Sequence, residues 1–185
     1  MEPVMSLPLS PPGTWQIDSS HTQVGFSIRH LGISTVHGMF TEYAAQVLIG
    51  EDLESSGIEF TAATKSVDTG NAWRDEHLVG DLFFESDKFP EITFRSVSLE
   101  STGDTYQLVG DLTVKEVTKA ITFDLAFQGS CVFPMDEKTH AGFQATATIR
   151  RSEFGVGYGV PVASDVVVIR IDAQLIAPFE EGADI

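Results

Sequence analysis

The chain has 185 residues, a length that suits one domain able to bury a sizeable core or enclose a cavity. Its formal net charge of −16 argues against nucleic acid or an anionic membrane surface as partner, because both would repel it. Thirteen Phe accompany only three Tyr and two Trp. Because Phe has no polar group, this composition favours either a Phe-packed core or a cavity wall for an apolar ligand.

Residues 1–13 contain four of the eight prolines. We expect them to form a disordered lead-in, followed by one domain over 14–178 and a C-terminal tail over 179–185. The first residues have neither the basic nor the apolar segment of a secretory signal, and no stretch has the length and apolar character of a membrane span. We therefore expect a cytoplasmic protein without stable membrane insertion, or a periplasmic or secreted one if a signal has been removed. The single cysteine, Cys131, excludes an internal disulfide and predicts a half-buried strand thiol.

From Trp15 onward, apolar and polar residues alternate with period two, which is typical of strands with one buried face. The first such segments cover 23–29, 36–50 and 58–62. A short helix follows over 71–78, and it can be capped by Asp68, Thr69 or Asn71 at its start and by Gly80 after its end.

The second half of the chain alternates more regularly. Alternating segments cover 92–99, 106–115, 121–128, 143–150 and 167–175, and a change of face within the first of them predicts a β-bulge near Ser96. The total is about eight strands. Their short connections, such as the turn at 101–104, predict antiparallel neighbours.

Eight antiparallel strands can bury their apolar faces in a two-sheet sandwich or in a closed barrel, which leaves no exposed edge. Ala62, Gly110, Ala145 and Ala147 lie at inward positions and favour a barrel with space along its axis, although covering Phe rings would fill that space. We expect an all-β, extended eight-stranded antiparallel barrel with one short α-helix. The predicted cavity wall consists of Phe26, Ile28, Phe60, Ala62, Phe94, Leu108, Leu112, Phe123, Leu125, Phe143, Ala145, Ala147 and Ile149.

Basic side chains gather near predicted strand ends and on the helix. Arg29 and His30 end the first strand, and Arg74 and His77 share one face of the helix because they are three residues apart. Arg150 and Arg151 form a second basic pair beside a glycine-rich loop that could act as a mobile lid, and Arg150 is the candidate of this pair. These five side chains are candidate contacts for a ligand head group. For Arg74, the alternative is an ion pair with a neighbouring acid.

Patterns for catalysis or metal binding are weak. Asp18 and His21 form a D-x-x-H sequence, but residues three apart on a strand point to opposite faces unless the chain bends. Asp75 and His77 form a second short acid–histidine pair, and no HExxH, H-x-H or carboxylate cluster occurs. We expect no catalytic residue, no metal site and no required cofactor.

Four longer segments carry a further set of motifs, which follow one another in the order and with the spacing of one known family. They read WQIDSSHTQVGFSIRHLGISTVHGMF at 15–40, KSVDTGNAWRDEHLVGDLFFESDKFPEITF at 65–94, VGDLTVKEVTKAITFDLAF at 109–127 and AGFQATATIRRSEFGVG at 141–157. Together they resemble the YceI-like family of lipocalin-like polyisoprenoid-binding proteins. The resemblance implies an eight-stranded lipocalin-like barrel, with the helix over one end, that encloses an apolar tube for a polyisoprenoid chain or polyprenyl quinone. Many members carry a secretory signal, which this chain does not show.

From the resemblance we expect a lipid-binding protein rather than an enzyme, acting as carrier, reservoir or stress-related lipid binder. The alternative is an enzyme that acts on a prenyl substrate in the same cavity. The expected partner is a small-molecule lipid and not nucleic acid, with a homodimer as an open alternative to a monomer. A bound isoprenoid lipid or quinone would be the ligand, and the charge of −16 favours a neutral head group over a diphosphate.

Overall fold

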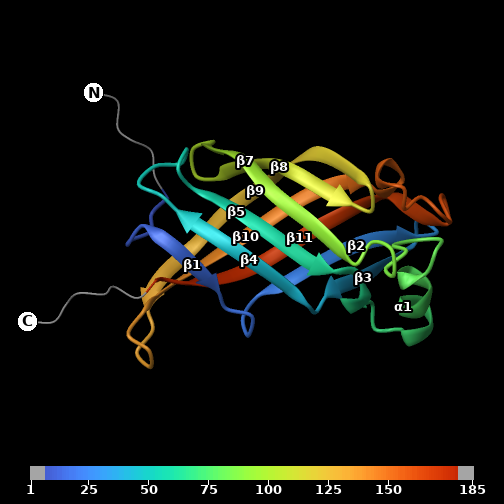
Figure 1. Cartoon of the computed structure of the whole chain (residues 1–185), viewed down its shortest axis with the longest axis horizontal. Coiled ribbons are helices and arrows are strands. Elements are labelled where there is room, and N and C mark those ends of the chain that lie inside the picture. Colours follow the sequence, from blue (N-terminus) through green and yellow to red (C-terminus); the bar gives the residue numbers. More distant parts are fainter. Residues whose placement is uncertain (1–6, 179–185) are drawn as a thin grey trace, which may run out of the picture.

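The computed structural model describes residues 7–178 and shows strands wound into one elongated barrel (Figure 1). Its strands are β1 (Gly13–Ile17), β2 (Gln23–His30), β3 (Ser34–Phe40), β4 (Tyr43–Ile49), β5 (Gly57–Ala63), β6 (Val67–Asp68), β7 (Glu91–Ser101), β8 (Tyr106–Val114), β9 (Val117–Val132), β10 (Thr139–Arg150) and β11 (Ala163–Ile176). The helices are α1 (Ala72–Val79) and two short 3-10 helices, η1 (Thr64–Ser66) and η2 (Arg151–Phe154).

The eleven strands make an eight-stranded barrel because three of the barrel strands are interrupted. β1 and β2 follow one another along β11, where Ile17 pairs with Leu175 and Gln23 pairs with Asp172. In the same way β4 and β3 lie along β1 and β2, and β5 and β6 lie along β4 and β3. With β7 to β11 these form eight antiparallel positions, and the pairing of β1 with β11 closes the ring. The predicted fold class is confirmed.

Local features follow the sequence. The pairing of β7 with β8 shifts between Ser96 and Ser98, as the change of face predicted. Among the three candidate caps of α1, the side chain of Asn71 accepts a hydrogen bond from the backbone N–H of Arg74, and Gly80 follows the last helical residue.

The described part of the predicted lead-in is packed against the barrel, which corrects the expectation of disorder for residues 7–13. Leu7 is buried in the core, and the indole Nε1 of Trp15 donates to the carbonyl of Pro11 at 3.0 Å. An apolar side chain at position 7 gains more by burial than by exposure to water. The rest of the lead-in, 1–6, and the tail over 179–185 lie outside the described residues. Cys131 is exposed rather than half-buried.

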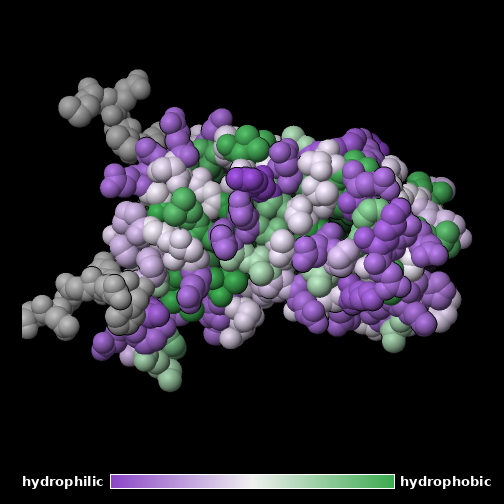
Figure 2. Space-filling model, viewed as in Figure 1, coloured by the Kyte–Doolittle hydropathy of each residue, from purple (hydrophilic) through white to green (hydrophobic). Residues whose placement is uncertain are grey.

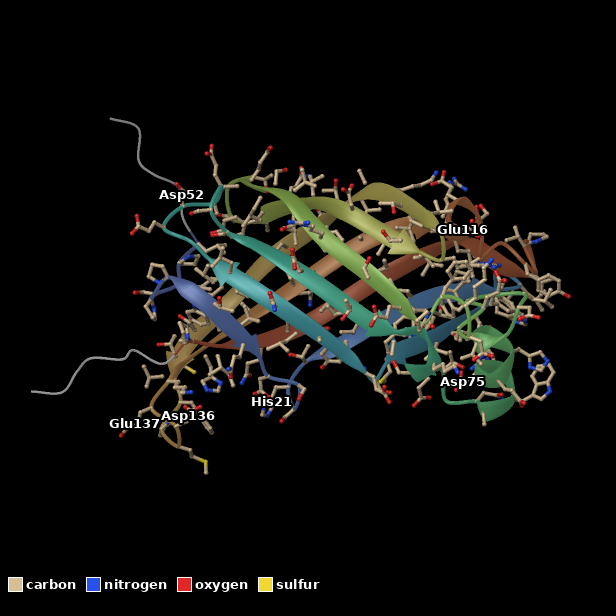
Figure 3. The ribbon with its side chains drawn as sticks, viewed as in Figure 1. His21, Asp52, Asp75, Glu116, Asp136 and Glu137 are labelled. Atoms are coloured by element: carbon tan, nitrogen blue, oxygen red, sulfur yellow. The ribbon has the colours of Figure 1, made fainter. Side chains whose placement is uncertain are left out.

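The two ends of the barrel differ in what covers them. The α1 end carries α1, the turn between β2 and β3, the turn between β8 and β9, and η2 (Figure 1). The terminal end carries the turn between β9 and β10 together with residues 7 and 178; Figure 3 labels Asp75 at the α1 end and Glu137 at the terminal end. The terminal end holds the largest fully buried side chain, Trp15, whereas no residue of α1 is buried.

Candidate functional site

The barrel encloses a cavity of about 700 Å³, a volume within the usual range for small-molecule sites. Apolar side chains line most of it, with contributions from β2 to β5 and from β7 to β11. The few polar groups of its wall lie mainly at the α1 end, where His30, Asn71, Arg74 and His77 reach it. The site therefore has an apolar body and a polar end. Because Trp73 and Tyr158 line the cavity at this end and are also exposed, we refer to it as the mouth.

Twelve of the thirteen predicted wall residues line this cavity. They are Phe26, Ile28, Phe60, Ala62, Phe94, Leu108, Leu112, Phe123, Leu125, Phe143, Ala145 and Ile149. Strict alternation along the strands explains this agreement, because every second side chain of a barrel strand points inward. That these residues contact a ligand stays a prediction.

The small inward residues divide into two kinds. Ala62 and Ala145 line the cavity and leave space there. Gly110 lies beneath the ring of Phe94, since a Cβ atom built on it would stand 2.4 Å from the ring carbon Cζ. Ala147, predicted as cavity wall, is 4% exposed, packs in the core and does not line the cavity. At Gly110 a covering Phe ring therefore replaces open space, as the alternative expectation had it.

Three of the five candidate head-group residues lie at the mouth. His30, Arg74 and His77 all line the cavity. The guanidinium of Arg74 donates from Nε to the hydroxyl of Thr69 at 2.7 Å and from Nη2 to its carbonyl at 2.9 Å, so a backbone and side-chain contact replaces the alternative of an ion pair with a neighbouring acid. Asp75 binds the same residue: its Oδ1 accepts from the backbone N–H and from the hydroxyl of Thr69, so Thr69 bridges Arg74 and Asp75.

The other two candidates face away from the cavity, which corrects their expected place. Arg29 is exposed and donates to the hydroxyl of Thr35 across the turn between β2 and β3. Arg150 is exposed and forms an ion pair with Asp165 at 3.6 Å. Ile28 and Ile149 point into the cavity. Because successive side chains of a strand point to opposite faces, the residue after each of them points outward.

Sequence reasoning placed Arg151 in a basic pair but chose Arg150 as the site candidate, whereas Arg151 lines the cavity and is 7% exposed. Its guanidinium donates to the carbonyls of Val156, Tyr158, Ala163 and Ser164 at 2.6–2.8 Å. Burial lowers the pKa of Arg151. These hydrogen bonds hold the glycine-rich loop against the barrel. The expectation of a mobile lid is therefore corrected. The adjacent arginines in the sequence were the available signal.

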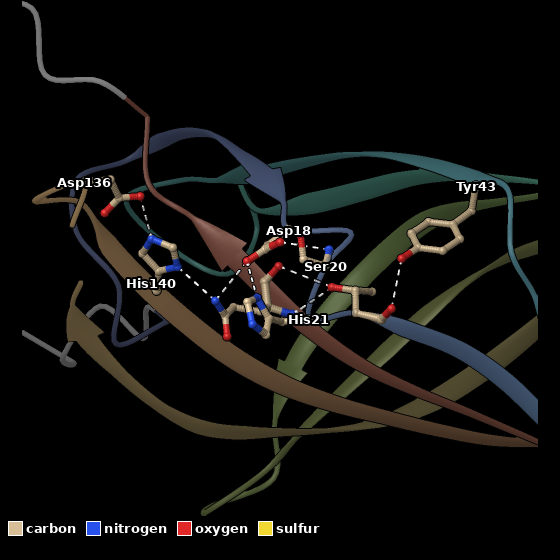
Figure 4. Close-up of polar contacts among 8 residues, drawn as sticks. Asp18, Ser20, His21, Tyr43, Asp136 and His140 are labelled. Atoms are coloured by element: carbon tan, nitrogen blue, oxygen red, sulfur yellow. Dashed lines mark hydrogen bonds and ion pairs between the residues drawn. The ribbon is translucent and has the colours of Figure 1, made fainter. Parts of the chain in front are cut away.

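A polar network lies on the outer wall at the terminal end (Figure 4). The chain bends between β1 and β2, so Asp18 and His21 do meet, with 2.8 Å between Oδ2 and Nδ1. That hydrogen bond is the main reason that the pKa of Asp18 lies below its usual value. The second predicted pair does not meet: His77 Nδ1 lies 2.6 Å from the carbonyl of Trp73, away from Asp75.

Gln174 joins this pair to a second one. Its amide Nε2 lies 3.1 Å from Asp18 Oδ2 and 2.9 Å from Nδ1 of His140, whose Nε2 is 2.9 Å from Asp136 Oδ2. Because the amide donates to Nδ1, the ring proton of His140 lies on Nε2 and is donated to Asp136. The network connects the end of β1 with β10 and β11. None of these four side chains lines the cavity, so we assign the network a structural role.

The comparison with known families decides the classification: the YceI-like domain matches residues 15–175. This chain belongs to the YceI-like family. A UPF0312 protein of Staphylococcus aureus (strain USA300) is 33% identical over 169 residues, which cover 90% of this chain and 94% of that protein.

Solved structures of similar shape agree with the family assignment. A Campylobacter jejuni YCEI protein is 31% identical with a TM-score of 0.73, covering 88% of this chain and 96% of that one. Burkholderia cenocepacia BcnA is 21% identical with a TM-score of 0.77, over 86% of this chain and 99% of that one. A polyisoprenoid binding domain from Saccharophagus degradans is 14% identical with a TM-score of 0.68, over 91% and 100%. The last two show likeness of fold.

Two further features concern the described part of the YceI-like chain. Between residues 7 and 178, no group of three or more His, Cys, Asp or Glu side chains is arranged to hold a metal ion. Within the same residues, no helix combines the length and apolar character needed to cross a bilayer.

Proposed function

We propose that this YceI-like protein binds the tail of a polyisoprenoid-type lipid, a polyprenyl chain or polyprenyl quinone, in the barrel cavity. In this role it serves as a carrier, reservoir or stress-related lipid binder rather than as an enzyme. The observation that carries the proposal is the cavity of about 700 Å³ inside the barrel, whose wall is almost wholly apolar. The family and the polyisoprenoid binding domain among its structural neighbours support it.

The affinity comes from the tail. β11 has 14 residues and so measures roughly 46 Å along the strand, or about 35 Å along the barrel axis at a tilt near 40°. Several isoprene units fit lengthwise in such a barrel. Each has five carbons, and its burial releases on the order of 3–4 kcal/mol before the entropy of binding is subtracted. A few units give tight binding without any polar contact.

The head group rests at the mouth. The available polar atoms there belong to His30, Asn71, Arg74 and His77, and two nitrogens of the Arg74 guanidinium already donate to Thr69. A neutral head that accepts one or two hydrogen bonds, such as a quinone, suits this set better than a diphosphate, which would also approach a chain of charge −16.

A length series tests the proposal. Polyprenols of increasing length are titrated into the protein, and we expect the affinity to rise at least about tenfold for each of the first added units and then to level off when the tail fills the cavity. An affinity that does not depend on tail length would contradict the proposal. Turnover of a prenyl substrate that is lost on alanine substitution at His30 and His77 would instead favour the enzymatic alternative.

A further inference from the structure

Exposed apolar side chains gather at the α1 end of the barrel. We call this set the apolar rim; it consists of Leu31, Ile33, Trp73, Leu82, Tyr158, Val160 and Val162. Ile33 is 80% exposed and Trp73 is 72% exposed, values far from those of core residues. Figure 2 shows apolar residues, in green, at the right-hand tip of the molecule among hydrophilic neighbours. Apolar groups gathered on one surface mark a place of interaction.

Two contacts join parts of the rim, and two of its members lie on the cavity wall. The backbone N–H of Leu31 donates to the carbonyl of Val162 at 2.8 Å, which joins the turn between β2 and β3 to the glycine-rich loop. The ring of Tyr158 packs edge-on against Phe83 at 5.6 Å, which joins that loop to the segment after α1. Trp73 and Tyr158 belong to the rim and also line the cavity. A molecule bound at the rim therefore reaches the cavity directly.

The α1 end is close to neutral although the chain is strongly acidic. The segments that form this end are 29–34, 64–91, 114–119 and 150–165. They contain eight of the 11 Lys and Arg residues and ten of the 27 acidic residues, so their formal charge is −2 against −16 for the whole chain. The repulsion that opposes approach to other surfaces is weakest here.

We propose that the apolar rim docks on the surface of a lipid bilayer of little net charge, and that the lipid passes between bilayer and cavity at this contact. The inference rests on the proposed function, because a polyisoprenoid tail has very low solubility in water and must come from a lipid phase. Trp and Tyr, which the rim presents beside aliphatic side chains, are the residues that favour the membrane–water interface. The docking is peripheral: the rim enters the interfacial layer and no segment crosses it.

A second copy of the chain is the competing occupant of the rim. A dimer built through this surface would place two cavity mouths against each other and shut both off from a lipid source. The near-neutral charge together with the position of the rim at the mouth favours the bilayer.

The test compares two double variants by co-sedimentation with phosphatidylcholine vesicles. In the rim variant Ile33→Ser/Val162→Ser, both side chains are exposed and neither lines the cavity. We expect it to bind vesicles about tenfold or more weakly than the wild type, because two interfacial apolar groups are lost. The matched control is Val132→Ser/Met135→Ser, which removes two exposed apolar side chains at the terminal end and should leave vesicle binding unchanged.

Three outcomes would overturn the proposal. The wild type does not bind the vesicles; the rim variant binds as well as the wild type; or analytical ultracentrifugation shows a wild-type dimer that the rim variant converts to a monomer. A separate experiment tests the proposed function: a polyprenol dissolved in ethanol is added to the protein without vesicles, and its binding is measured. We expect the rim variant to take up this polyprenol to the wild-type extent at equilibrium but to accept it from vesicles more slowly.

Discussion

The two ends of the barrel each contain a Trp residue, but they differ in how far that side chain is buried. Each end has one of the two Trp residues: Trp15 at the terminal end is 0% exposed, and Trp73 at the α1 end is 72% exposed. Around Trp15 the core is closed by Leu7 and other buried side chains. Around Trp73 the helix buries none of its residues. The Trp of the terminal end is therefore enclosed by buried side chains, whereas the Trp of the α1 end is exposed beside the cavity.

The polar contacts of the two ends differ in the same way. At the terminal end, Asp18, Gln174 and His140 connect three strands through side chains (Figure 4). At the α1 end, Arg151 holds a loop through backbone carbonyls, and the remaining polar groups of the cavity mouth have room for a ligand. Polar side chains thus connect strands at the terminal end and line the cavity at the α1 end, and we expect substitutions at the two ends to have separable effects.

The largest expected effect is on stability at the terminal end. Trp15→Ala should lower the free energy of unfolding by about 3–5 kcal/mol, because it removes a large, fully buried side chain and leaves a void. The measurement is denaturant unfolding, with Trp73→Ala as the matched control at the α1 end. We expect less than about 0.5 kcal/mol for that control, because its side chain is exposed. Equal losses in the two variants would show that the ends do not differ.

A second pair of substitutions separates binding from stability within one strand. Ala145→Phe should weaken polyprenol binding at least about tenfold with little change in stability, since position 145 faces open space in the cavity. Ala147→Phe should cost about 1–3 kcal/mol of unfolding free energy, because position 147 is packed. Lipid titration and denaturant unfolding of both variants check this pair. If Ala147→Phe weakened binding and Ala145→Phe lowered stability instead, position 145 would not be the one that faces the cavity.

The network at the terminal end should make stability depend on pH. Because the pKa of Asp18 is lowered in the folded protein, its contribution is present above the usual carboxyl pKa of about 4 and is lost as the pH falls through the lowered folded value. Asp18→Asn should therefore cost about 1.5 kcal/mol at pH 7 and progressively less as the pH falls below about 4. Denaturant unfolding of both proteins across this pH range measures the difference. A difference that does not shrink as the pH falls below about 4 would contradict the assignment.

The smallest effect is expected at the helix cap. Asn71→Ala removes the acceptor of the Arg74 backbone N–H and should destabilise α1 by about 0.5–1 kcal/mol. Because α1 buries no side chain, the loss should appear as faster hydrogen exchange of its amides rather than as a lower global stability. Unchanged exchange in α1 would show that the cap contributes nothing there.

The sequence predicted those features that depend on local alternation. The inward side of each strand and the bulge near Ser96 follow from neighbouring residues, and the cap of α1 is one of the three candidates that the sequence offered. Most of the cavity wall also follows from neighbouring residues. Ala147 was wrongly predicted to line the cavity because alternation shows that a side chain points inward but not whether other side chains cover it.

Features that depend on distant contacts could not be predicted. Asp18 and Gln174 are 156 residues apart, and His140 is 34 residues from Gln174. Arg29 and Arg150 were proposed for the site because they end strands, yet the same alternation that directs their neighbours inward directs them outward. The folded chain shows that Arg151, rather than its neighbour Arg150, lines the cavity.

Native mass spectrometry of the protein purified from its own host tests the central claim most directly. If the cavity holds a polyisoprenoid-type lipid, the wild type should carry a non-covalent adduct of fixed mass that organic extraction removes, and Ala145→Phe purified in the same way should carry much less of it. Repeated absence of any lipid from the wild type, or an adduct retained in full by Ala145→Phe, would contradict the account.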